Sequence, residues 1–185
     1  MGVGQVTFTG RLLVATPVIA DPNFERTVVL ILAHGDEGAL GVVLNRPSLT
    51  AVAEVVEEWA PYAAEPDMMF IGGPVGQNAV VGLGLGSASH DGIQPVVGPL
   101  GTIDLNEPPD PDDGAAVTVR LFAGSAGWAS GQLEDELAEG AWWLIDAAPD
   151  DPLTSQPDEL WSQVLRRQGT KVSWFANHPD DPTAN

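Results

Sequence analysis

The chain contains no cysteine and no long apolar run, and each absence excludes a class of protein. Without cysteine there are no disulfides, no thiolate metal ligands and no cysteine nucleophile, which agrees with a cytoplasmic location. The longest apolar run, at 28–33, is far shorter than the ~20 residues that span a bilayer. The N-terminus shows neither the basic nor the apolar part of an export signal. We therefore expect a cytoplasmic protein that does not enter a membrane.

Basic residues are also scarce, with 7 Lys and Arg against 26 Asp and Glu and a formal net charge of -19. Such a field repels nucleic-acid phosphates and anionic membranes. The basic residues form no run beyond Arg166 and Arg167. The sequence therefore predicts no direct nucleic-acid binding. A role in regulation would be indirect, through a protein partner.

What the chain does contain is a globular composition, with 185 residues of which 44% are hydrophobic. Short apolar runs between glycine, proline and acidic residues predict strands. Three of these strands are expected within residues 11–47. Residues 27–33 are apolar at nearly every position, which is typical of a strand buried on both faces. Further strands are expected within 68–104, at 115–122 and at 141–147.

Helices are expected where an apolar stripe or a cap and stop pair occurs. The first has its apolar residues at the spacing i, i+3, i+4, i+7. The expected limits are Ser48 or Thr50 to Pro61, Ser130 to Gly140, and Ser155 to Gly169. An acidic, proline-rich surface loop is expected at 106–114. Residues 1–176 are expected to form a single domain, and 177–185 an acidic, mobile tail.

Three segments resemble the YqgE/AlgH family of bacterial proteins: residues 10–47, the sequence "GGPV" at 72–75, and residues 120–143. The resemblance to this family spans most of residues 10–165. It implies an α+β fold in which a bifurcated mixed β-sheet, partly closed into a small barrel, is surrounded by helices. It implies little about function, because the family is largely uncharacterised and some members carry only the label of transcriptional regulator.

The stretch "AGSAG" at 123–127 is one residue away from the G-x-S-x-G nucleophile elbow of the α/β-hydrolases. If Ser125 were the nucleophile, Asp146 and His178 would follow it in the order of a catalytic triad. His178, however, lies in the predicted tail. The resembled family also usually has tyrosine at the position of Ser125, which argues against a required hydroxyl.

An elbow needs a sharp turn from a strand into a helix, so that backbone N–H groups can hold the oxyanion. Here the helix signal begins only at Ser130. We interpret the segment as a tight turn that brings Trp128 to the core and precedes a capped helix. An enzyme of unknown reaction, for example a serine hydrolase using Ser125, remains the alternative function.

Neither a cofactor nor a metal is predicted. The only lysine is Lys171, so no phosphate-binding loop of the Gly-x-x-x-x-Gly-Lys type is present. His34 and His90 each stand beside acidic residues in turns, which supplies only fragments of a metal site. The glycine-rich strands are better explained by bulges and close backbone approach than by phosphate binding.

The arginines are the most informative residues, because Arg11, Arg26, Arg46 and Arg120 adjoin or interrupt apolar strand-like runs. A buried charge without a partner is costly, so each needs one. One interpretation pairs them with nearby acids such as Asp21, Glu25 or Glu134. The other has some of them converge on a cleft that binds a small anionic ligand or an acidic segment of a protein. The predicted ligand- or partner-binding residues are Arg26, His34, Asn45, Arg46, Arg120, Trp128 and Gln132.

The hairpin around residues 34–38 makes this hypothesis specific. In an antiparallel pair joined there, Arg26 and Arg46 lie together at the end of the ribbon away from His34. They should share a carboxylate or an anionic ligand. The leading hypothesis is therefore a non-catalytic binding or adaptor protein, with the enzyme as the alternative and a transcriptional regulator as the third.

Overall fold

The computed structural model describes residues 6–86, 93–110, 112, 114, 116–169 and 171–177. The predicted tail beyond Asn177, with His178, lies outside the described residues. So do His90 and the acidic residue beside it.

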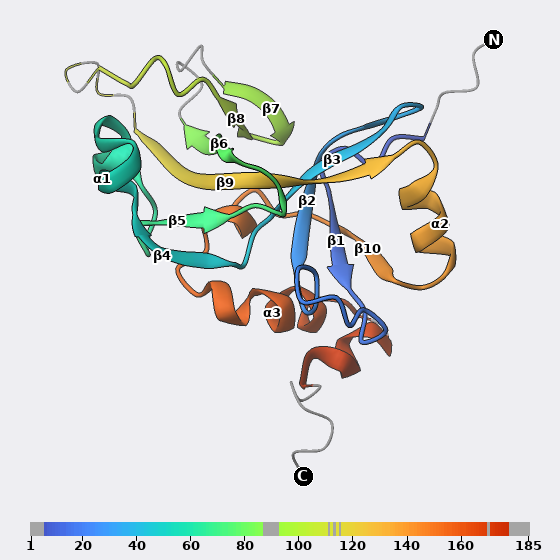
Figure 1. Cartoon of the computed structure of the whole chain (residues 1–185). Coiled ribbons are helices and arrows are strands. Elements are labelled where there is room, and N and C mark those ends of the chain that lie inside the picture. The colour runs from blue at the N-terminus through green and yellow to red at the C-terminus, as the bar shows by residue number, and fades with distance from the viewer. Residues whose placement is uncertain are drawn as a thin grey trace.

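A mostly antiparallel sheet, curled into a half-barrel, forms the body of the molecule, and short helices flank it (Figure 1). The strands follow the order β10-β1-β2-β3-β9-β6-β8-β7, and β4 and β5 branch off at β9 through a parallel β5–β9 pairing. This confirms a fold of the α+β class in its coarse outline. The strands are β1 Arg11–Ala15, β2 Val28–Gly35, β3 Gly38–Val43, β4 Pro47–Ala51, β5 Met68–Ile71, β6 Val75–Gly86, β7 Ile93–Val97, β8 Leu100–Ile103, β9 Val117–Ala129 and β10 Trp142–Asp146.

The first hairpin agrees with the sequence pattern. Strands β2 and β3 pair in antiparallel register from Val29 and Val43 to Gly35 and Gly38 at the turn. Residues 28–31 are buried on both faces, since alternate side chains enter two different core clusters. The register places residues 26 and 46 at the open end of the hairpin.

Strand β9 is much longer than the sequence predicts. The prediction of a tight turn at 123–127 is wrong, because these residues belong to the strand. The strand runs without interruption through Ser125 to Ala129, pairing with β6 on one edge and with β5 and β3 on the other. Gly124 has a φ of 77°, and a Cβ there would lie 2.6 Å from the backbone oxygen of Gly73. Gly124 therefore permits two backbone segments to pack closely.

The helices are shorter than predicted, and none of the three expected side-chain caps is present at its helix. The first expected helix is one turn, α1 Val52–Val55, followed by the 3₁₀ segment η1 Glu57–Tyr62. Its proposed cap residues belong to β4. The other helices are α2 Gln132–Ala138 and α3 Leu160–Arg166, with the 3₁₀ segments η3 Asp151–Leu153, η4 Pro157–Glu159 and η5 Lys171–Asn177.

The residues that precede α2 and α3 differ from the predicted serine caps. Gly131, in the left-handed region, stands at the N-cap of α2, while the Ser130 hydroxyl donates to the backbone oxygen of Asp36. Before α3, the 3₁₀ segment η4 takes the place of a cap at Ser155.

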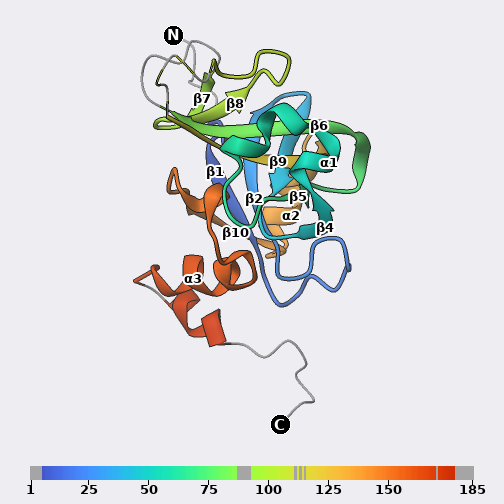
Figure 2. The same cartoon turned by 90° about the vertical axis from the view of Figure 1, so that its left-hand side faces the viewer.

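Helix α3 covers one face of the sheet, as Figure 2 shows, and its buried side chains join the largest core cluster. Among the described residues, no helix is long and apolar enough to cross a membrane. The arrangement leaves a gap in packing where the open end of the β2–β3 hairpin meets the N-terminal end of α3, and the candidate site lies there.

Candidate functional site

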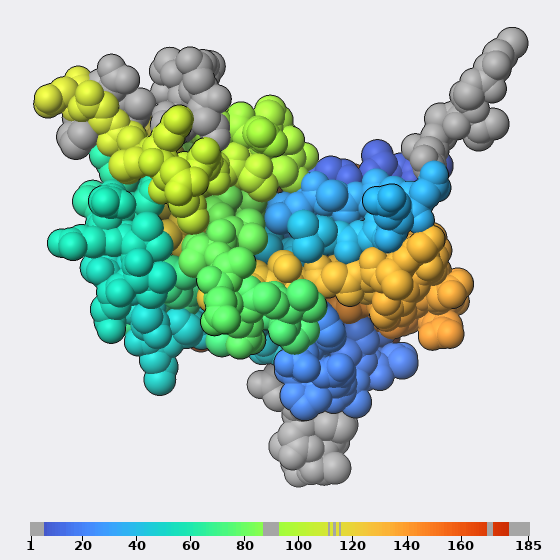
Figure 3. Space-filling view, turned by 45° about the horizontal axis from the view of Figure 1, so that its top comes forward, coloured from blue at the N-terminus to red at the C-terminus, as the bar shows by residue number. Residues whose placement is uncertain are grey.

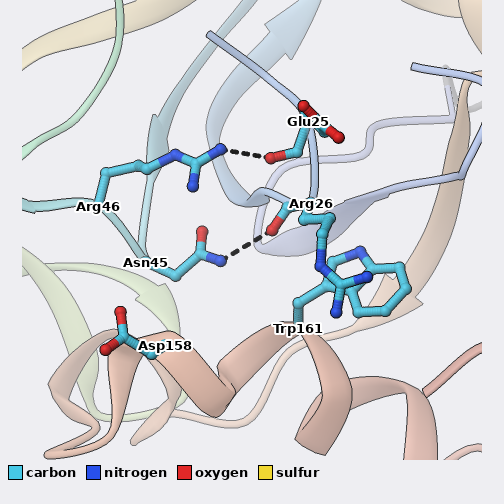
Figure 4. A pocket seen from close by; sticks show the side chains of 6 residues that line it. All are labelled: Glu25, Arg26, Asn45, Arg46, Asp158 and Trp161. Carbon is cyan, nitrogen blue, oxygen red and sulfur yellow. Dashed lines mark hydrogen bonds between the residues drawn. The ribbon is translucent and has the colours of Figure 1, made fainter. Parts of the chain in front are cut away.

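A cavity of about 510 Å³ lies between the open end of the β2–β3 hairpin and the start of α3 (Figure 4). Loop, hairpin and helix each contribute to its wall. The lining residues are Glu25, Arg26, Asn45, Arg46, Asp158 and Trp161. We call this the arginine cavity.

Asn45 fixes the loop that carries Arg26. Its side chain is buried, with 7% of the residue exposed, and its Oδ1 accepts a hydrogen bond of 3.0 Å from the backbone N–H of Val28. Its Nδ2 donates at 2.9 Å to the backbone oxygen of Arg26. One amide thus satisfies a donor and an acceptor of the loop at the same time.

Arg46 reaches the same loop from the hairpin. Its guanidinium donates to the backbone oxygen of Glu25 (Figure 4). In the loop, the partner of Arg46 is therefore a backbone carbonyl, whereas the sequence predicted a carboxylate shared with Arg26 or an anionic ligand. A carbonyl positions the guanidinium without neutralising it, so Arg46 keeps its charge at the wall of the cavity.

Arg26 is held by its backbone conformation and by an aromatic ring. Its φ of 54° lies in the left-handed region, the only non-glycine residue there in the part of the chain that the structure describes. Its guanidinium carbon lies 4.1 Å from the centroid of the Trp161 ring. Trp161 is itself fixed, with 2% of the residue exposed and its indole N–H donating to the backbone oxygen of Ala15. A cation over a buried indole is stabilised by the ring quadrupole.

Other arginines are bound to acids outside this cavity. Arg11 pairs with Asp146 at 3.2 Å, and Arg167 pairs with the buried Asp151 at 2.7 Å. Hydrogen bonding with Asp151 raises the pKa of Arg167. The arginine cavity brings two arginines together with the exposed carboxylates of Glu25 and Asp158.

Arg120, predicted as a ligand-binding residue, is instead part of the core. It is 1% exposed, and burial lowers its pKa to about 10. Its side chain lies over the ring of Phe70, 4.1 Å from the centroid. Its guanidinium donates to five backbone oxygens, those of Ala64, Glu65, Pro66, Pro152 and Thr154. The role is structural, since it ties two irregular loops to β9.

His34, Trp128 and Gln132 gather at the opposite end of the hairpin, near α2. His34 Nε2 lies 2.7 Å from Glu134 Oε1, and its Nδ1 accepts from the backbone N–H of Phe8. The indole N–H of Trp128 donates to Glu136, as does the Gln132 amide. The seven predicted residues thus lie in three separate places: Arg26, Asn45 and Arg46 line the arginine cavity, Arg120 lies in the core, and the others lie near α2, where His34 and Trp128 line another cavity of about 400 Å³.

Ser125 does not have the geometry of a nucleophile elbow. It lies inside β9, paired in register with Val75 of β6, and α2 begins only at Gln132. Asp146, the acid of the hypothetical triad, is paired with Arg11. Among the described residues, no three of His, Asp and Glu gather as metal ligands.

Sequence reasoning missed Asp158 and Trp161 as members of the site. Trp161 has the spacing of a core residue in the last helix. Asp158 has the position of an acidic residue in the first turn of a helix. No local signal connects either to a hairpin more than a hundred residues earlier. Only the packing of α3 on the sheet brings them to the arginines.

Comparison with known proteins shows the family of the chain. The AlgH-like family model matches residues 12–173, and the chain belongs to this family. It is 49% identical to a UPF0301 protein of Streptomyces avermitilis, covering 100% of this chain and 99% of the relative. It is 43% identical to a UPF0301 protein of Mycobacterium tuberculosis, covering 95% and 90%.

Two solved structures share the fold. A protein of Corynebacterium diphtheriae is 32% identical, with a TM-score of 0.84, covering 95% of this chain and 94% of that one. The AlgH protein of Pseudomonas aeruginosa is 28% identical, with a TM-score of 0.68, covering 98% and 99%. The resemblance drawn from the sequence segments is therefore confirmed.

Proposed function

We propose that this protein is a cytoplasmic binding protein without catalysis of its own. Its arginine cavity binds an anionic group that belongs to a small ligand or to a protein partner. The observation that carries the proposal is the convergence of Arg26 and Arg46 on one cavity of a chain with a net charge of -19. The guanidinium of Arg26 lies over the Trp161 ring, and that of Arg46 donates to the backbone oxygen of Glu25, so both side chains have fixed positions at the cavity wall.

The geometry favours a carboxylate over a more highly charged group. Guanidinium groups recognise carboxylates and phosphates through paired N–H donors. Glu25 and Asp158 line the same cavity, so a second negative charge on the ligand meets repulsion. Because the loop is already fixed by Asn45, little ordering is needed on binding.

The remaining surface supports the same choice of partner. The net charge of -19 disfavours the approach of anions in general, so binding an anion requires a site that contains arginines. It also opposes approach to DNA, so any regulatory role would run through the bound partner. The hydrolase alternative draws no support from Ser125, which lies in mid-strand.

Thermal unfolding in sodium acetate and in sodium phosphate, against sodium chloride at equal ionic strength, tests the proposal. We expect acetate to raise the Tm of the native chain more than phosphate does. Arg46→Gln should abolish the acetate effect. Arg166→Gln is the matched control, since Arg166 is an exposed arginine bonded to Asn177 outside the cavity. An acetate effect that is equal in both variants would contradict the proposal.

A further inference from the structure

We infer that the arginine cavity is one end of a longer groove that binds an extended segment of a partner protein. An acidic residue of this segment lies at the arginines, and an apolar side chain lies at the other end. The inference rests on the proposed function, because it identifies the bound anion as a side-chain carboxylate.

Three cavities that share lining residues make up the proposed groove. The second, of about 180 Å³, shares Arg46 with the arginine cavity. The third, of about 300 Å³, shares Ile71 and Gln77 with the second. In Figure 3 the segment that follows β5, in green, borders the blue loop of residues 17–25, and the second cavity lies between these two parts of the chain.

The "GGPV" segment at 72–75 shapes the wall of the middle cavity. Gly73 has a φ of 152°, and a Cβ there would lie 2.2 Å from the backbone oxygen of Ser125. Any side chain would push this segment away from β9. Gly73 and Pro74 instead lie low against the sheet and line the cavity. A motif that the anion site leaves unexplained thus has a place in the groove.

The far end of the groove is apolar and partly exposed. Val55 is 49% exposed and Ile71 41%, and both line the third cavity with Met69, Val80 and Ala123. Exposed apolar side chains that gather around one cavity gain from being covered, because their hydration is unfavourable. The lining therefore changes along the groove from cationic side chains to a mixture of apolar and uncharged polar ones.

The polar side chains along the groove favour a peptide over an acyl chain. Asn23 and Gln77 line the middle cavity, and Ser48, Thr50 and Asn78 line the third. An acyl chain would cover these amides and hydroxyls without pairing them, which is costly. An extended peptide offers one donor and one acceptor at each residue. Its carboxylate also complements the arginines, whereas the acidic surroundings repel it elsewhere.

The test begins with a phage-displayed library of random decapeptides selected on the immobilised full chain. We expect enriched peptides to carry Asp or Glu at one position and Leu, Met or Phe at a fixed distance from it. Synthetic versions of these peptides then give Kd by fluorescence anisotropy. Arg46→Gln and Val55→Asp should each weaken binding by about tenfold or more. The controls, Arg166→Gln and Val6→Asp, change an exposed arginine and an exposed valine outside the groove and should leave Kd unchanged.

The outcomes separate this inference from the proposed function. If acetate raises the Tm but the library yields no enriched peptide, the anion site is supported and the peptide-binding groove is overturned. Peptides that need Arg46 but tolerate Val55→Asp overturn it as well. Competition of the peptide by decanoate but not by acetate points to an acyl ligand and contradicts a peptide occupant. A dimer that Val55→Asp dissociates identifies a second copy as the occupant. A peptide Kd that is unchanged by Arg46→Gln overturns both proposals.

Discussion

The guanidinium of Arg26 lies 4.1 Å from the ring centroid of Trp161, although the two residues are far apart in the sequence and belong to different layers of the fold. The contact joins the loop before β2 to helix α3. It orients a cation at the cavity wall, while a left-handed backbone conformation brings the residue there. Substitution of Arg26 can therefore separate two contributions to stability: the strain of its left-handed backbone and the contact of its side chain with the Trp161 ring.

Arg26→Gly should be more stable than Arg26→Ala by about 1–2 kcal/mol, because alanine keeps the left-handed strain that glycine avoids. Both lose the contact with Trp161. Urea unfolding of the two variants measures the difference. At Arg166, the last residue of α3, the same pair of substitutions should have the opposite order, since glycine is the poorer helix former. Equal stability of the two Arg26 variants would contradict the assigned backbone conformation.

Asn45→Ala should lower the free energy of unfolding by about 1–3 kcal/mol, because it leaves the backbone N–H of Val28 and the carbonyl of Arg26 without their partner. Asn78→Ala, at an exposed asparagine, should change it by less than about 0.5 kcal/mol. Urea unfolding compares the two variants. Similar values for both would show that Asn45 does not hold the loop.

Arg120→Met should lower the free energy of unfolding by about 3 kcal/mol or more, because five backbone oxygens lose their donor. Arg120→Lys should not restore stability, since an ammonium lacks the planar fork that reaches all of them. Arg46→Gln, at a half-buried site with one carbonyl partner, should cost about 1 kcal/mol. A small effect of Arg120→Met in urea unfolding would return this arginine to the candidate binding residues.

Glu134 should make stability depend on acid pH. Hydrogen bonds from its own backbone N–H and from His34 lower its pKa below the ordinary value of 4.5. Because the pKa is lower in the folded state, the stabilisation is present above that ordinary value and is lost as the pH falls through the folded-state pKa. Glu134→Gln should remove this part of the pH dependence, as followed by urea unfolding between about pH 2 and 6. The exposed Glu37→Gln is the control and should leave the pH dependence as it is.

The sequence predicted the β2–β3 hairpin and the position of Arg26 and Arg46 at its open end, because both follow from local periodicity and antiparallel register. It did not predict the length of β9. Gly124 suggested a turn, but the glycine is needed because the backbone of Gly73 approaches it closely. Gly73 belongs to the connection between β5 and β6, about fifty residues earlier in the chain.

The error at Arg120 has a similar cause. An arginine within an apolar run needs partners, and the sequence suggested acids or a ligand. The actual partners are backbone carbonyls of two irregular loops, around Pro66 and Thr154, and carbonyls leave no mark in a sequence. Trp161 was missed because its periodicity is that of a core residue, which it also is.

The central claim is that Arg26 and Arg46 form an anion site, and a titration of the ¹⁵N-labelled chain with sodium acetate, followed by two-dimensional NMR, tests it most directly. The indole N–H of Trp161 and the backbone N–H groups of residues 25–28 and 45–46 should shift together with one Kd. The same signals should stay fixed in Arg46→Gln, while Arg166→Gln shifts as the native chain does. Shifts confined to other regions, or an equal response in Arg46→Gln, would contradict the account.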